Sequence, residues 1–200
     1  DVELVDKLED KLGLIDLVLT MAYRAKCSLG ETLGTVGIWD AILYNEFKKR
    51  KIAVPPKKLS SYTDSIEGGY VNDHLIMQYN MSPETIVNNI IPGTTVDKLL
   101  DMPEVDMPDN TCLTATGQLF RNDVNGIIPQ IIQEYYDERV VIKEKMIDAK
   151  QRYEKNKTKA IEREISLLDN NQMAIKIAMN SFYGALANKY FRYFDVRVAE

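Results

Sequence analysis

The last third of the chain most constrains the fold, because apolar residues recur there at helical spacing over two long stretches. The first stretch runs from Ile131 to about Tyr153, and the second from near Thr158 to about Ala185, with a polar turn around Asn156 between them. Two long helices joined by a short polar turn form an antiparallel hairpin. We therefore expect a helical hairpin as the main element of the fold.

The rest of the sequence predicts shorter elements. Apolar residues at alternating three- and four-residue steps from Val5 to Ala22 predict one long helix over about residues 2–25. Ser82-Pro83-Glu84 has the pattern of a helix N-cap followed by proline, so a short helix is expected there. The other expected elements are a helix around 39–47, a linker at 50–67, a helix within 73–80, a loop at 91–111 and short strands between 112 and 128. The predicted fold class is mainly α with a minor β part (α+β).

Composition narrows the possible classes of protein. The chain has 200 residues, of which 45% are hydrophobic, and its net charge is −5, which argues against indiscriminate adsorption to nucleic acid. No apolar run reaches the roughly 20 residues that a membrane span requires, so no membrane partner is expected. Cys27 and Cys112 lie far apart without metal-ligand spacing, which favours a reducing cytoplasm.

The second long helix carries a polar stripe beside its apolar face. Lys176, Asn180 and Tyr183 share one side of the helix, and Arg139 and Lys143 share one side of the first helix. If the two faces converge, three cations and an amide surround a volume suited to a polyphosphate. From spacing alone, these side chains could equally be ordinary surface residues. Asn180 and Ser181 are mediocre helix formers in a helix interior, which favours a functional reason for them.

Tyr183 and Gly184 allow two interpretations. A tyrosine beside a glycine could lie against a base pair, with the hydroxyl group reaching minor-groove acceptors. It could equally be a core tyrosine beside a glycine that ends the helix. Spacing does not decide between them.

The residues of this stripe resemble a known motif. Lys176-Ile-Ala-Met-Asn180-Ser-Phe-Tyr183-Gly184 is similar to the K-x-x-x-N-S-x-Y-G motif B of family B DNA polymerases, and residues 184–195 continue as in the replicative polymerases of T-even-like bacteriophages. Asp1-Val-Glu-Leu-Val resembles the end of the third exonuclease motif, Glu67-Gly-Gly-Tyr70 the glycine turn before the polymerase domain, and residues 78–85 the palm segment after motif A.

The resemblance implies a domain organisation: an antiparallel helical fingers hairpin on a partial polymerase palm. Residues 1–60 correspond to the C-terminal helices of the exonuclease domain and a linker, and residues 61–128 to part of the palm. Residues 129–185 correspond to the fingers, and residues 186–200 to the start of the return to the palm.

The resemblance also implies roles for the site residues. Arg139, Lys143, Lys176 and Asn180 bind the incoming deoxynucleoside triphosphate, and Lys176 has the catalytic role of protonating the leaving pyrophosphate. Tyr183 and Gly184 contact the nascent base pair. Asp1 matches a metal ligand of the exonuclease.

Two departures from the family pattern concern metal binding. Motif A should lie between Val71 and His74, where only Asn72-Asp73 stands, and motif C should follow Glu200. The family uses two Mg²⁺ ions held by carboxylates. Neither polymerase carboxylate set is present in these residues, and Asp73 is a poor substitute because the flanking strand is missing as well.

The predicted function is that of one part of a template-directed DNA polymerase in phage DNA replication, in the cytoplasm of an infected bacterial host. The implied partners are primer-template DNA, deoxynucleoside triphosphates, the remaining polymerase segments and a sliding clamp. Two alternatives stay open: a non-catalytic polymerase relic that binds nucleotide or DNA, and a subunit of a split polymerase whose missing aspartates come from another chain.

Overall fold

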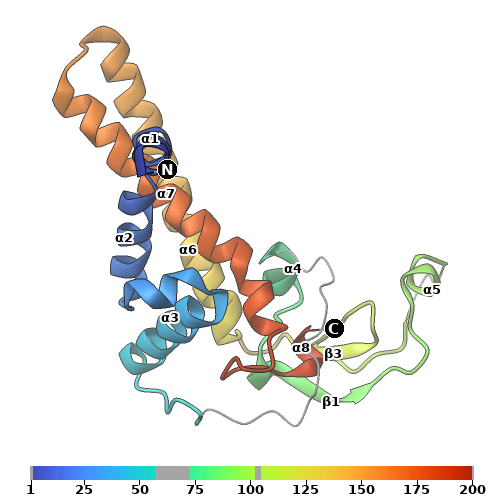
Figure 1. The fold of residues 1–200 in the computed structure, drawn as a ribbon. Helices are drawn as coiled ribbons and strands as arrows, with labels where there is room; N and C mark the ends of the chain where they lie inside the picture. Colours follow the sequence, from blue (N-terminus) through green and yellow to red (C-terminus); the bar gives the residue numbers. More distant parts are fainter. Residues whose placement is uncertain (1, 57–72, 102–104, 200) are drawn as a thin grey trace. The chain divides into compact units, whose positions relative to one another are not determined.

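The computed structural model describes residues 2–56, 73–101 and 105–199 (Figure 1). These residues belong to two compact units, which are described separately below. The first unit is Asp1–Val54 with Tyr135–Ser181, and the second is Pro55–Glu134 with Phe182–Glu200. Asp1 and the predicted glycine turn at 67–70 lie outside the described residues, as does most of the predicted linker.

The N-terminal segment of the first unit forms two helices, α1 (Val2–Leu12) and α2 (Leu14–Ala25), so the prediction of one continuous helix is wrong. The break is at Gly13, whose φ of 59° and ψ of 39° are left-handed, a conformation that glycine adopts without a steric penalty. The Glu9 carboxylate accepts the backbone N–H of Ile15 at 3.0 Å, which satisfies one donor at the start of α2.

Two further elements follow in the first unit. The short 3₁₀ helix η1 (Leu29–Leu33) was not predicted; it begins with a capping box in which the Glu31 carboxylate accepts the Ser28 backbone N–H at 2.7 Å. Helix α3 (Thr35–Lys49) confirms the helix predicted around residues 39–47.

The predicted helical hairpin is confirmed by α6 (Ile127–Lys155) and α7 (Lys159–Leu186), which Figure 1 shows as the two longest helices. Two contacts within the first unit place them side by side. Arg152 donates to Glu164 Oε1 at 2.6 Å near the turn, and Arg139 Nη2 lies 3.5 Å from Gln172 Oε1 further along. Gly184 does not end α7, which continues to Leu186.

The core of the first unit surrounds Trp39, which is 0% exposed. Its indole Nε1 donates to the carbonyl oxygen of Ala178 at 2.8 Å, so α3 is joined to the C-terminal third of α7. The Ser181 hydroxyl group donates to the same carbonyl oxygen at 2.8 Å. The apolar residues buried in this unit include Ile38, Ile42, Leu43, Met146, Ala149, Ala174 and Ile175.

The second unit contains a three-stranded antiparallel sheet with strand order β1-β3-β2. The predicted strands between residues 112 and 128 are confirmed as β2 (Thr111–Leu113) and β3 (Gln118–Arg121). Phe120 is the buried centre of the sheet, since it pairs with Ile86 on one side and Cys112 on the other. The remaining elements are α4 (Asp73–Gln78), η2 (Pro83–Thr85), β1 (Ile86–Ile90), α5 (Val96–Asp101) and α8 (Val196–Ala199).

Three of these elements differ from the predictions. Pro83–Thr85 forms a single 3₁₀ turn instead of a short α-helix, because the chain continues at once into strand β1, which was not predicted. Helix α5 occupies part of the segment predicted as a loop. Helix α4 lies within the predicted range.

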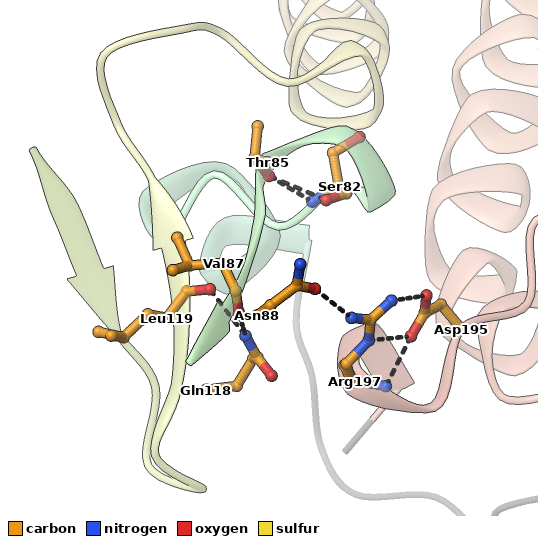
Figure 2. Close-up of polar contacts among 8 residues, drawn as sticks. All are labelled: Ser82, Thr85, Val87, Asn88, Gln118, Leu119, Asp195 and Arg197. Atoms are coloured by element: carbon orange, nitrogen blue, oxygen red, sulfur yellow. Dashed lines mark hydrogen bonds and ion pairs between the residues drawn. The ribbon is translucent and has the colours of Figure 1, made fainter. Parts of the chain in front are cut away.

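A polar network ties the end of the chain to the sheet (Figure 2). The Arg197 guanidinium pairs with the Asp195 carboxylate at 2.7 Å and donates to Asn88 Oδ1 of β1 at 3.1 Å. Beside it, the Gln118 amide donates to the carbonyl oxygens of Val87 and Leu119 at 2.7 and 2.8 Å. These side chains therefore hold α8 against β1 and reinforce the β1–β3 pair.

The structure confirms the fold class, which is mainly helical with a small antiparallel sheet. Among the described residues, no helix combines the length and the apolar composition needed to cross a lipid bilayer.

The position of Trp39 leads to a prediction about stability. Trp39→Phe removes the hydrogen bond to Ala178 and leaves a space in a closely packed core, so the free energy of unfolding should fall by about 2 kcal/mol. Urea unfolding followed by circular dichroism measures the change. Ser181→Ala is the matched control, because Trp39 still donates to Ala178 in that variant and the loss should stay below about 1 kcal/mol. Equal losses in the two variants would contradict the importance assigned to Trp39.

Candidate functional site

The polar stripe on α7 is exposed along its length in the first unit. Lys176 and Asn180 are exposed, whereas Ile175 and Met179 beside them are buried. The helical period produces this separation, because residues four apart project from the same side. Neither the Lys176 nor the Asn180 side chain forms a hydrogen bond or ion pair with another residue in the described part of the chain. Both polar groups are therefore accessible to a ligand.

Arg139 of α6 contacts α7 at Gln172, which precedes the exposed stripe. Its Nη2 is 3.5 Å from Oε1 of Gln172, at the long end of the hydrogen-bond range. Gln172 is one helical turn before Lys176, so Arg139 reaches α7 about 6 Å along the helix axis from the predicted catalytic lysine. Arg139 Nε is buried and has no hydrogen-bond partner among the described residues. The guanidinium group thus retains an unused donor.

Lys143 lies one helical turn beyond Arg139 on α6 and is exposed. Within the ranges that the structure describes, it forms no ion pair or hydrogen bond. The structure brings Arg139 to Gln172 of α7, one helical turn before Lys176, whereas the convergence of Arg139, Lys143 and Lys176 stays a prediction.

Two residues that sequence reasoning did not select hold this region in place. Trp39 binds Ala178, which lies between Lys176 and Asn180 in the sequence. Arg24 of α2 donates to Glu138 of α6 at 2.5 Å, next to Arg139 in the chain. The sequence indicated that Trp39 belongs to the apolar side of its helix, since it shares helical spacing with Ile42 and Leu43, but it did not indicate Ala178 as the partner. It carried no signal for the second contact, because nothing in the spacing pairs residue 24 with residue 138.

Ser181 has a structural role that accounts for a hydroxyl residue in the helix interior. Its hydroxyl group donates to Ala178 O within α7, and it also lies 3.3 Å from the Trp39 Nε1. The two residues of the Asn180-Ser181 pair therefore differ in role: Ser181 supports the contact with α3, and Asn180 remains exposed.

Tyr183 and Gly184 belong to the second unit. Tyr183 is half-buried and Gly184 is exposed, while Phe182 between Ser181 and Tyr183 is fully buried. Tyr183 is thus not a fully buried core tyrosine. Its predicted contact with a base pair stays a prediction.

The described residues do not fit the two-metal site that the resemblance implies. No group of three His, Cys, Asp or Glu side chains in residues 2–56, 73–101 and 105–199 could hold a metal ion. Asp73, the carboxylate at the position expected for motif A, begins α4 in the second unit. Burial raises the pKa of Asp73 from 3.8 to about 6, and nearby His74 partly opposes the increase in pKa. A lone carboxylate of this kind cannot hold two ions.

A groove of about 960 Å³ lies elsewhere in the first unit. It runs between α2 and the first half of α7, where Asp16 and Thr20 face Lys159, Arg163 and Asn170. None of the predicted site residues lines it. The groove is therefore not the predicted triphosphate site.

The first unit thus carries an exposed lysine and an exposed asparagine on the second helix of a long hairpin, and the second unit contains a small antiparallel sheet. Residues 74–200 match the model of the family described as DNA polymerase family B. The chain belongs to this family.

The relatives extend the comparison to the whole chain. The chain is 26% identical to the DNA-directed DNA polymerase of Enterobacteria phage T4 and 24% identical to that of Escherichia phage RB69, with all of the chain matched in both. It covers 29% and 28% of these relatives, so it spans less than a third of their length. Each alignment extends over 259 residues, more than the 200 of this chain, so the relatives carry segments that this chain lacks within the matched region.

The fold is also similar to a solved structure. The family B DNA polymerase of the hyperthermophilic archaeon Pyrobaculum calidifontis superposes with a TM-score of 0.68 over 96% of this chain, which corresponds to 25% of that protein. The sequence identity is 18%, so this likeness concerns the fold.

The pKa of Asp73 leads to a prediction about pH. The folded pKa of about 6 exceeds the unfolded value, so the folded state binds the proton more tightly, and the free energy of unfolding should fall as pH rises from about 4 through about 6. Asp73→Asn removes this loss, so the variant should gain stability relative to the unaltered chain between pH 4 and pH 7. Urea unfolding at both pH values measures the difference. Asp97→Asn, at an exposed aspartate of α5, is the control, and a similar pH dependence of its relative stability would contradict the prediction.

Proposed function

We propose that this chain is part of a template-directed DNA polymerase, in which the α6–α7 hairpin binds the triphosphate of the incoming deoxynucleotide. The observation that carries the proposal is the contact of Arg139 with Gln172 of α7, one helical turn before the exposed Lys176. If the side chains of Arg139, Lys143, Lys176 and Asn180 converge, their charges and amide match the oxygen-rich surface of a triphosphate. Family membership supports the proposal, since the residues concerned lie within the matched range of 74–200.

Each side chain has a distinct task in this proposal. The planar guanidinium of Arg139 binds two phosphate oxygens at once, whereas Lys143 and Lys176 supply compact charges. Lys176 stabilises the charge that develops on the leaving pyrophosphate and protonates it, which makes its contribution larger in the transition state than in the ground state. Asn180 donates from its amide to a neighbouring phosphate oxygen.

The proposal assigns Tyr183 and Gly184 to the nascent base pair. A half-buried tyrosine offers a rigid apolar ring and a hydroxyl group, both suited to the minor-groove edge. An exposed glycine allows close approach of a flat partner, because it has no side chain.

The partners follow from the polymerase assignment. They are primer-template DNA, deoxynucleoside triphosphates and Mg²⁺, together with the remaining polymerase segments, an exonuclease domain and a sliding clamp, in the cytoplasm of an infected bacterial host. The metal ligands must come from residues outside those described, so the contribution of the described residues is to bind and orient the triphosphate.

Lys176→Ala tests the nucleotide site within a complete polymerase that contains these residues. Single-turnover incorporation should slow by about 100-fold, because the variant loses the charge opposite the leaving group. Primer-template affinity should remain nearly unchanged. Lys150→Ala, at an exposed lysine of the same hairpin, is the control. An unchanged rate and nucleotide affinity in the Lys176 variant would remove Lys176 from the mechanism.

The 200-residue chain alone should not extend a primer, whatever concentration of Mg²⁺ and nucleotide is supplied. The reason is that phosphate-binding cations cannot align two metal ions with a 3′-hydroxyl group unless carboxylates hold those ions. A primer-extension assay with the purified chain tests the prediction. Extension that persists in the Lys176→Ala variant would come from a contaminating polymerase. Extension that disappears in the Lys176→Ala variant would contradict the prediction and direct attention to Asp73.

A further inference from the structure

The described arginines differ in the kind of group they contact. Four of them pair with carboxylates at 2.5 to 2.9 Å: Arg24 with Glu138, Arg121 with Asp123, Arg152 with Asp148 and Glu164, and Arg197 with Asp195. Arg139 instead contacts the neutral amide of Gln172 at 3.5 Å. Its positive charge is therefore not neutralised by that partner.

The amide of Gln172 is held in one orientation. Gln172 is only 8% exposed, and its Nε2 donates to the Asp169 carboxylate at 2.9 Å. An amide presents its carbonyl oxygen to a donor and its NH₂ group to an acceptor. The bond to Asp169 therefore fixes the oxygen toward Arg139, and a buried polar side chain acquires a partner at both ends.

The position of this contact relates it to the triphosphate site. Gln172, Lys176 and Asn180 follow one another at four-residue steps along α7, so they project from neighbouring sides of the helix, with Gln172 buried and the other two exposed. Arg139 Nε is buried without a hydrogen bond among the described residues. Gln172 thus holds the guanidinium group at α7 one helical turn before Lys176, and the contact leaves part of the hydrogen-bonding capacity of Arg139 unused.

We propose that Gln172 is a positioning residue, which holds Arg139 beside the triphosphate site through a neutral contact that preserves the charge of the arginine. The inference rests on the proposed function. A phosphate oxygen forms a charge-assisted hydrogen bond, which is stronger than one to an amide, so a polyphosphate can draw the guanidinium away from Gln172. A carboxylate at position 172 would hold Arg139 as an ion pair and compete with that ligand.

The test moves the carboxylate without changing the net charge. In Asp169→Asn/Gln172→Glu, the amide and the carboxylate exchange places, so an amide can still donate to a carboxylate and Arg139 still has an acceptor. Isothermal titration with inorganic tripolyphosphate on the 200-residue chain measures binding. We expect the dissociation constant to rise about tenfold, because Arg139 then has an anionic partner. A merely structural role for Gln172 predicts an unchanged dissociation constant, since the hydrogen bonds are kept.

A second variant covers the case in which the double variant does not fold. Gln172→Met has a similar length and cannot accept a hydrogen bond, so Arg139 should become mobile and the dissociation constant should rise about threefold. The NMR signal of the Arg139 Nε–Hε group reports that mobility, with exposed Arg163 as the reference for a mobile arginine. Gln151→Met, at an exposed glutamine of α6, is the matched control and should change neither measurement. Circular dichroism confirms folding in each case.

The outcomes separate this inference from the proposed function. If tripolyphosphate does not bind, or binds equally well after Lys176→Ala, the proposed function fails and the role of Gln172 fails with it. If Lys176→Ala weakens binding but the folded exchange variant binds as tightly as the unaltered chain, only the role of Gln172 is overturned. The same holds if the exchange variant does not fold and Gln172→Met leaves both the dissociation constant and the Arg139 signal unchanged.

Discussion

The indole N–H of Trp39 is bonded to the carbonyl oxygen of Ala178, a residue that stands between Lys176 and Asn180 in the sequence of α7. Trp39 is fully buried, so the bond is shielded from water and the tryptophan cannot leave without exposing a donor and a large apolar surface. Ala178 is itself buried, on the side of α7 that packs against α3. Lys176 and Asn180 project from the other side of α7 and are consequently exposed, because the apolar side of the helix is the one that packs against α3.

The size of the buried residues on α7 makes this contact possible. Ala174 and Ala178 are one helical turn apart, and both line a small space together with Ile38 and Ile42 of α3. Small side chains allow the indole ring to approach the α7 backbone closely. The charged residues next to this core are treated in two ways: the charge of Glu138 is paired with that of Arg24, whereas the neighbouring Arg139 meets only an amide. Two consecutive residues of α6 therefore serve different purposes, anchoring the helix in one case and offering charge in the other.

The hairpin and the stripe could be predicted from the sequence because both depend on the helical period, which repeats over many residues. The break at Gly13 could not be predicted from apolar spacing, because the spacing continues across a left-handed glycine. Strand β1 was not predicted because Asn88 and Asn89 are poor strand formers. In the structure, pairing with β3 outweighs the low strand propensity of these two residues. The partners of Arg139 and Trp39 were also out of reach, since they join residues 33 and 139 positions apart.

Phosphate binding and metal binding make different demands on a chain. Residues four apart in a helix project from the same side, so a short stretch of sequence is enough to place cations and amides together. The residues of the proposed site on α6 and on α7 are arranged in this way. Two metal ions instead need carboxylates brought together from separate segments, and the described residues contain no such group. The phage relatives carry additional segments within the matched region, and they extend well beyond it. The described residues can therefore form the proposed nucleotide-binding hairpin, whereas the two-metal site of the proposed function needs carboxylates from outside them.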